Sequence, residues 1–414
     1  MRCLKRFRRV HPTTQKQETN QTRSTQRNTQ MKPHTKLLAA VSAFGVGLAL
    51  SSTVTQADIV IGGLLETSGP VASLGAPGLE GAKLAVKQVN EAGGIDGEQV
   101  RFININTESD NTASVSATRK LISQEKVVGI IGAMNSGSSY AIIDFVQRAG
   151  VPLISNGGSR GIALPAEEKP FIFVAPLTDL LVQSVILSDM KAKGITKIAV
   201  LNSDSGFGTS GEEQLEHHVA DYGIEIVVQK TFGNSDTDMT PQLLDIRNSD
   251  AEAVVLWSTG PAQAIATRNF RQLDLDLPFY LSHAANDFNF IKLTEGAADG
   301  VLIPSSKLYV KEDLPASDPQ KEAIETFATG YEAEYGQSPA TFAGNGYDAA
   351  MLLMQAIDAA DLTDPKLIRD AIETTQDHVG VTAVYTYSPE DHFGAQADSV
   401  VLLTVEDGKF VIKD

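Results

Sequence analysis

Cysteine is almost absent from this chain, whose 414 residues include only Cys3. Cys3 falls in an N-terminal stretch that we interpret as a removable leader, so we expect the mature protein to contain no thiol. Such a protein can form no disulfide, bind no metal through cysteine and use no cysteine nucleophile. The predicted cleavage site also has no cysteine that could carry a lipid anchor.

Long hydrophobic runs are missing as well. The run at residues 37–50 has fourteen residues, too few to cross a bilayer. It follows the basic segment 31–36 and precedes small residues, which is the pattern of a secretory signal peptide. We therefore predict a leader over residues 1–57, with Met31 as the true start and cleavage before Asp58. We expect the mature protein in the periplasm, soluble and without a lipid anchor.

Basic residues are scarce once the leader is set aside. Ten of the 34 Lys and Arg residues and one of the 51 Asp and Glu residues precede Asp58, which leaves 24 basic against 50 acidic residues and a net charge of about −26. Nucleic acid and anionic lipid headgroups are poor partners for such a surface. The alternative for the basic residues 1–30 is a nucleic-acid-binding arm.

Two common catalytic motifs are also absent, since the chain has no Walker loop and no H-E-x-x-H helix. The adjacent His217 and His218 point apart on a helix and cannot chelate together. His392 lies in a predicted turn, and the carboxylates of Asp236 and Asp238 are too few for a calcium site. We therefore expect no enzyme activity, no cofactor and no metal site.

After the leader, strand-like and helix-like segments alternate in the order that parallel β-α-β units need. The predicted strands are 58–65, 99–106, 127–131, 152–155, 198–202, 224–232, 253–257, 279–282 and 300–303. The predicted helices are 78–92, 112–124, 138–149, 179–193, 208–222, 239–248 and 261–273. The remaining 357 residues exceed what one hydrophobic core serves, so we expect an α/β fold with two doubly wound sheets in two domains.

A final helical block covers 319–335, 347–360 and 364–374, and strand-like segments follow near 381–387 and 400–411. This block could not form a third domain alone. We expect it to complete the two domains, with the chain crossing between them more than once.

Several segments together resemble one known family, the periplasmic binding proteins of branched-chain amino acid (Leu/Ile/Val-binding) type. The segments are 58–70 (DIVIGGLLETSGP), 81–97 (GAKLAVKQVNEAGGIDG), 131–136 (IGAMNS), 150–159 (GVPLISNGGS), Phe207-Gly208 and 346–349 (GYDA). The resemblance covers essentially all of residues 58–414, and its strength lies in the ordered set.

The resemblance implies a type 1 periplasmic binding protein fold, with two Rossmann-like lobes joined by three crossovers. We place the crossovers near Pro176, Pro304 and Tyr387. The N-terminal lobe is then 58–176 plus 304–387, and the C-terminal lobe is 177–303 plus 388–414.

The implied function is that of a monomeric solute-binding protein that delivers its ligand to the permease subunits of an ABC importer in the inner membrane. The implied ligand is a branched-chain amino acid or a similar small carboxylate. Uptake of aromatic acids, 2-oxo acids or amides is one alternative, and a soluble ligand sensor is another.

Two predicted loops follow strands at the sheet edge where ligands bind in open α/β sheets. Ser136 lies in a loop that leads into a helix, whose free N–H groups suit a carboxylate, and the resemblance implies that its hydroxyl binds one. The alternative is that Ser136 or Ser138 only caps the helix. In the next loop, the resemblance implies contacts from the Gly157 carbonyl and Ser159, beside Gly158; the alternative is an ordinary turn.

The resemblance implies three more ligand contacts. Phe207 matches an aromatic position that closes over the ligand, and Leu74 matches a residue that lines the pocket near the first strand. Thr259 or Gly260 falls near a second aromatic contact, although neither is aromatic. Each of these residues also has a plain structural alternative in the core or at the surface.

One position departs from the family pattern. Where the amino acid binders have an acidic residue that neutralises the ligand ammonium, this chain has His283. A neutral histidine is no counterion for an ammonium, and a protonated one would repel it. Asp287, Asp204 or Glu66 could substitute, although each is also a plausible loop carboxylate or cap.

Overall fold

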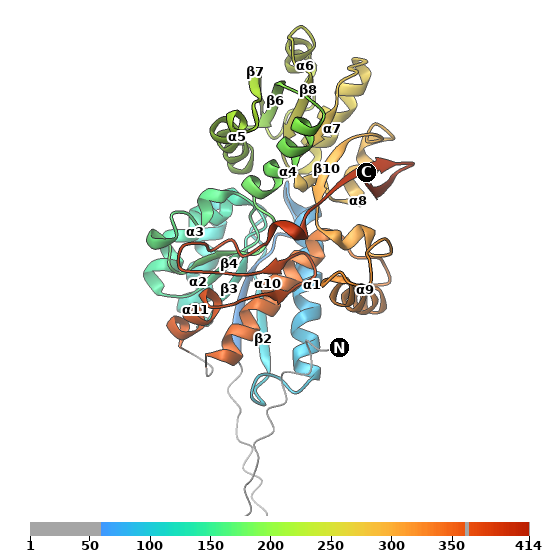
Figure 1. Cartoon of the computed structure of the whole chain (residues 1–414). Helices are drawn as coiled ribbons and strands as arrows, with labels where there is room; N and C mark the ends of the chain where they lie inside the picture. Colours follow the sequence, from blue (N-terminus) through green and yellow to red (C-terminus); the bar gives the residue numbers. More distant parts are fainter. Residues whose placement is uncertain (1–58, 361–363, 414) are drawn as a thin grey trace, which may run out of the picture.

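The computed structural model describes residues 59–360 and 364–413, which form the two lobes shown in Figure 1. The first lobe is built on a five-stranded sheet of order β2-β1-β3-β4-β5, and the second on a seven-stranded sheet of order β14-β13-β10-β9-β8-β6-β7. The predicted leader over residues 1–57, including Met31 and the cleavage site after Ala57, lies outside the described residues.

The five strands of the first sheet are all parallel. They are β1 (Ile59–Leu64), β2 (Val100–Asn104), β3 (Ile130–Gly132), β4 (Leu153–Ser155) and β5 (Ile172–Val174). The helices of this lobe are α1 (Ala72–Glu91), α2 (Asn111–Ser123), α3 (Ser136–Ala149), α9 (Lys321–Tyr335), α10 (Thr341–Ala359) and α11 (Pro365–Glu373).

The second sheet is parallel except at one edge. Its parallel strands are β6 (Lys197–Ser203), β7 (Glu225–Phe232), β8 (Ala253–Trp257), β9 (Phe279–Leu281) and β10 (Leu302–Ser305). The antiparallel strands are β13 (Val401–Glu406) and β14 (Lys409–Ile412). The helices are α4 (Asp179–Ala192), α5 (Gly206–His218), α6 (Thr240–Arg247), α7 (Gly260–Gln272) and α8 (Phe288–Thr294).

The mixed α/β architecture with two parallel sheets is therefore confirmed. Strands such as β8 are continuous apolar runs because helices cover both faces of a parallel sheet, and all five residues of β8 are buried. The short elements that sequence reasoning missed include β5 and α8, which have three and seven residues. It also merged β13 and β14, which a turn at Asp407 and Gly408 separates, both with positive φ.

Helices α1 and α10 pack closely across the first lobe. An added Cβ at Gly81 would overlap the carbonyl oxygen of Ala343, and one at Gly346 would overlap that of Gly78. Glycine therefore lets the two backbones touch. This contact brings the start of α10 beside the loop after β1.

The chain passes between the lobes after β5, after β10 and before β13. We placed the third passage near Tyr387, and that position is wrong. Tyr387 Oη donates to Val174 O at 3.0 Å, and farther along the chain Val174 N donates to His392 O at 2.9 Å. Residues 388–399 thus cover the edge of β5 in the first lobe, and the passage lies near Val400. An open strand edge attracts such a segment because its backbone groups need partners.

Within residues 59–360 and 364–413, no helix combines the length and the apolar character that a membrane crossing requires.

Candidate ligand-binding site

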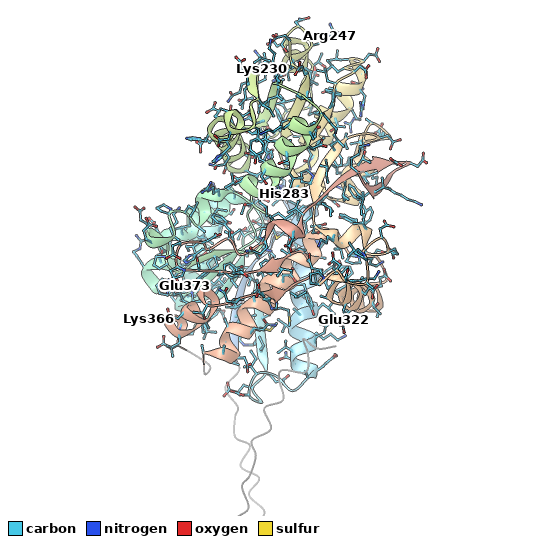
Figure 2. The ribbon with its side chains drawn as sticks, viewed as in Figure 1. Lys230, Arg247, His283, Glu322, Lys366 and Glu373 are labelled. Atoms are coloured by element: carbon cyan, nitrogen blue, oxygen red, sulfur yellow. The ribbon has the colours of Figure 1, made fainter. Side chains whose placement is uncertain are left out.

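A cavity of about 330 Å³ lies between the two lobes, at the carboxyl ends of the parallel strands of both sheets. Loops after β1, β3 and β4 line it from the first lobe, and loops after β6, β8 and β9 line it from the second. The start of α10 completes the wall. Figure 2 shows His283 at this junction. The volume falls in the range of small-molecule sites.

Ser136 stands at the cavity wall as the first residue of α3. It is 2% exposed, and its Oγ has no hydrogen-bond partner. The alternative that Ser136 or Ser138 caps α3 is wrong, because Asn135 is the cap and its Oδ1 accepts from Ser138 N at 2.7 Å. The Ser136 hydroxyl is therefore free to bind a ligand.

Glu66 supports this turn from behind. Its carboxylate accepts from Met134 N at 3.0 Å and from Asn135 Nδ2 at 2.7 Å. Burial raises the pKa of Glu66 to about 7, against the lowering effect of these hydrogen bonds. Glu66 does not line the cavity, so it positions the α3 cap and does not face a ligand.

The loop after β4 places alternate residues in the cavity. Asn156 and Gly158 line it, whereas Gly157 and Ser159 do not. An added Cβ at Gly157 would lie 3.1 Å from Ser136 Cα, so this residue faces α3. The predicted contacts from Gly157 and Ser159 therefore do not match the cavity wall. The reason is that neighbouring residues of an extended segment point to opposite sides.

From the second lobe, Phe207 and His283 form an aromatic wall. The Phe207 ring lies 5.5 Å from the His283 ring, edge to face, and 5.6 Å from the Trp257 ring. Burial lowers the pKa of His283 to about 4, so the ring is neutral at neutral pH. Its Nδ1 has no partner. Both residues line the cavity, as do Thr259 and Leu74.

Three helices begin at the cavity. The first residues of α3 and α5 line it, and so does Thr259, the N-terminal cap residue of α7. The starts of α3 and α5 face each other across the lobes, because an added Cβ at Gly206 would lie 3.4 Å from Gly137 Cα. Helix N-termini carry partial positive charge. The cavity therefore favours an anion.

Charged side chains are nearly missing from the wall. Asp204 is the one ionisable acid among the residues that line the cavity, and it lies exposed while accepting from Asn234 N at 2.9 Å. Asp287 caps α8 by accepting from Asn289 N at 2.9 Å and does not line the cavity. No Lys or Arg is among these residues.

Buried polar atoms without partners converge here from both lobes. In the first lobe they are Ser136 Oγ and both side-chain polar atoms of Asn156; in the second they are His283 Nδ1 and Asn234 Oδ1. A buried polar atom without a hydrogen bond is costly, and nearly all find partners in folded proteins. A ligand that bonds to this set removes that cost.

Asp179 joins the lobes next to the cavity. From the start of α4, its two carboxylate oxygens accept from Arg160 N at 3.0 and 3.1 Å, and its own N–H donates to Gly158 O at 2.9 Å. Burial raises the pKa of Asp179 to about 6. These bonds hold the loop that carries Gly158 against the second lobe.

Two glycine-rich segments have the spacing of catalytic motifs but different surroundings. Residues 206–211 match G-x-G-x-x-G after a strand, yet β7 ends on threonine and phenylalanine, without the acidic residue of a dinucleotide site. Residues 157–161 match G-x-S-x-G, but Ser159 Oγ approaches a carbonyl oxygen of α5 at 3.5 Å. Among the described residues, no histidine is bonded to it. No nucleophile–base pair is formed.

Several wall residues were not singled out from the sequence. They include Asn111, Met134, Asn135, Asn156, Asn234, Phe342 and Asn345. Asn156 lies inside the loop that was singled out, so alternation along an extended segment could have identified it. Phe342 and Asn345 come from α10, and no local pattern links that helix to loops two hundred residues earlier. In the part of the chain that the structure describes, no group of His, Cys, Asp and Glu is arranged to hold a metal.

Comparison with known proteins gives consistent matches. A family profile described as periplasmic binding protein matches residues 58–409. The Leu/Ile/Val-binding protein homolog 7 of Brucella abortus is 24% identical over 382 residues, which cover 90% of this chain and 94% of that protein. Homolog 8 of the same species is 25% identical over 354 residues, covering 82% and 86%.

Solved structures agree in fold over nearly the same region. An extracellular ligand-binding receptor from Rhodopseudomonas palustris superposes with a TM-score of 0.81 at 26% identity. The superposition covers 86% of this chain and 100% of that one. The branched-chain amino acid transporter substrate-binding protein LivJ from Streptococcus pneumoniae, crystallised with isoleucine, gives a TM-score of 0.74 at 25% identity, covering 86% and 98%.

Proposed function

Because the chain belongs to the periplasmic binding protein family, in its branched-chain amino acid type, we propose that it captures a small carboxylate-bearing solute between its lobes and delivers it to an ABC importer. The observation that carries this proposal is the set of buried, unpaired polar atoms on residues of both lobes that line one cavity. Such atoms are expected where a ligand completes the hydrogen bonds.

The carboxylate is assigned to the start of α3. The Ser136 hydroxyl is buried and free, and the first turn of α3 adds N–H groups and the positive end of the helix. Glu66 holds Asn135, so the turn keeps its shape without ligand. A serine hydroxyl and the N–H groups of a fixed helix start can both donate hydrogen bonds to one carboxylate group.

Capture follows from contacts made by both lobes. Ser136 and Asn156 belong to the first lobe, and Phe207 and His283 belong to the second. A ligand that binds both sets favours the closed arrangement, and only this difference in affinity can shift the lobes. The closed shape is then what the permease recognises.

The identity of the solute is a separate part of the proposal. The names of the relatives point to branched-chain amino acids as one candidate class. The neutral His283 favours the second class, small carboxylates without an amine such as aromatic acids and 2-oxo acids. No reaction is proposed, so the solute should leave unchanged.

We further propose that the mature chain acts in the periplasm as a monomer, with permease subunits in the inner membrane as its partner. The net acidic composition after residue 57 disfavours nucleic acid as a partner. A soluble sensor that passes ligand occupancy to another protein is the alternative. Uptake assays separate the two, because deletion of a transport component abolishes uptake and deletion of a sensor does not.

A thermal-shift screen tests the capture step. The protein from Asp58 onward is heated with each member of a set of small carboxylates and with the matching carboxamides. A ligand at 100 times its Kd stabilises the folded state by about 2.7 kcal/mol. We expect carboxylates to raise Tm and carboxamides not to. The proposal fails if no carboxylate shifts Tm, or if any ligand is converted to a product.

A further inference from the structure

We infer that the solute carries, besides its carboxylate, an uncharged polar group such as a hydroxyl, keto or amide group, and no ammonium. This inference rests on the proposed capture of a carboxylate and adds the chemical class of the ligand. It comes from the polar atoms that His283 and Asn156, two residues of the cavity wall, leave unpaired.

An ammonium in this cavity would lack a counterion. Among the residues that line the wall, only Asp204 is acidic, and it is exposed and already bonded to Asn234 N. Water screens such an exposed carboxylate. Glu66 and Asp287 accept hydrogen bonds from other parts of the protein and lie outside the wall. A buried charge without a partner is strongly unfavourable.

The helix starts oppose an ammonium further. The N-terminal ends of α3, α5 and α7 meet at the cavity, and each contributes partial positive charge. One carboxylate satisfies this potential. A second group with positive charge would be repelled by it, whereas an uncharged group is not affected.

The free polar atoms match an uncharged group. Asn156 offers an N–H₂ donor and a carbonyl acceptor, both buried and unpaired, in a side chain that is 4% exposed. His283 presents a free Nδ1 and packs against Phe207 at 5.5 Å between ring centres. The Asn156 amide and the His283 imidazole, one from each lobe, can donate to and accept from a hydroxyl, a keto oxygen or an amide.

The opposite lobes bring these two residues together. His283 follows β9 in the second lobe, and an added Cβ at Gly158 would lie 2.8 Å from its Nε2. Gly158 is therefore the residue that lets the imidazole approach the loop of Asn156. A larger residue there would displace His283 from the cavity.

The test compares ligands that differ only at one group. Isothermal titration of the protein from Asp58 onward is performed at pH 7.5 with leucine, 2-hydroxy-4-methylpentanoate and 4-methyl-2-oxopentanoate, and with phenylalanine, phenyllactate and phenylpyruvate. We expect the hydroxy or oxo acid of at least one series to bind at least about 100-fold more tightly than its amino acid, because the ammonium would be buried without a partner.

Two further outcomes distinguish a failure of this inference from a failure of the proposed function. If an amino acid binds as tightly as its hydroxy and oxo partners, or more tightly, the inference is overturned while carboxylate capture stands. If no member of either series binds, the proposed function is overturned together with the inference.

A pair of variants sharpens the test. His283→Asp places a carboxylate in the cavity wall and is expected to improve the affinity for the amino acid at least about 10-fold relative to its oxo partner, since it supplies a counterion. His283→Asn is the uncharged control and is expected to change this ratio less than His283→Asp does. Equal ratios in the two variants would contradict the role of His283. If His283→Asp does not fold, the wild-type titrations still decide.

Discussion

Removal of the Ser136 hydroxyl separates binding from folding. The Oγ atom is buried and bonds to nothing in the protein, so Ser136→Ala breaks no internal hydrogen bond. A hydrogen bond to a charged group is worth about 1.5–3 kcal/mol, which corresponds to a loss of roughly 10- to 150-fold in affinity for the carboxylate ligand. The free energy of unfolding without ligand should stay the same or rise slightly, because a buried unpaired atom is removed.

Ser138→Ala is the matched control, since Ser138 lies in the same turn of α3 and is also buried. Its Oγ accepts from Asn135 Nδ2 at 2.9 Å and lies 3.4 Å from Asn111 Oδ1. Its removal should cost about 1 kcal/mol of folding free energy, with a smaller effect on ligand affinity. The two variants should therefore show opposite patterns.

Both quantities are measurable on the same preparations. Urea unfolding without ligand gives the stability, and isothermal titration with the carboxylate that most stabilises the wild type gives the affinity. The reasoning is refuted if Ser136→Ala binds this ligand as well as the wild type does, or if it loses as much stability as Ser138→Ala.

Three other predictions concern stability. The pKa of His283 is lowered from 6.5 to about 4, which stabilises the fold above pH 6.5, and this contribution is lost as pH falls toward 4. His283→Asn should therefore reduce the loss of stability between pH 7.5 and 4.5 by about 2–3 kcal/mol, measured by urea unfolding. An unchanged loss would contradict this prediction. Asp348→Ala removes a buried carboxylate that accepts from donors in segment 381–385, and should cost about 3 kcal/mol or more by the same assay; a cost below about 1 kcal/mol would disagree. Gly346→Ala should overpack the contact of α10 with α1 and lower the free energy of unfolding by about 1–3 kcal/mol. Gly330→Ala in α9 is the control, because its new Cβ would meet only side-chain atoms, and it should be neutral or stabilising. Equal Tm values for the two variants would refute this prediction.

Much of the fold was predictable because its signals are local. Buried parallel strands are short apolar runs, and the helices between them show apolar residues at helical spacing. The elements that escaped include β5 and α8, which have three and seven residues, too few for a periodic signal. The third crossover was misplaced because His392 bonds to the edge of β5 and residues 394–399 bond to residues 384–386, contacts that no local pattern reveals.

The residues of the candidate site were also predictable only in part. Ser136, Phe207, Thr259, His283 and Leu74 line the cavity, as the resemblance to the family implied.

The next loop shows the limit, because Asn156 and Gly158 face the cavity and Gly157 and Ser159 do not. The side to which each residue of this loop points depends on the register of β4 against its neighbours.

The sequence by itself determined the alternation of strands and helices, the loops that could hold a ligand, and the histidine in place of an acidic residue. These depend on residue type and short spacing. Only the tertiary structure decided that His283 is buried and neutral, that Asn156 and Ser136 are left without partners, and that three helices start at one cavity. The physical reason is that burial, hydrogen bonding and helix direction arise from contacts between two lobes, whose residues lie far apart along the chain.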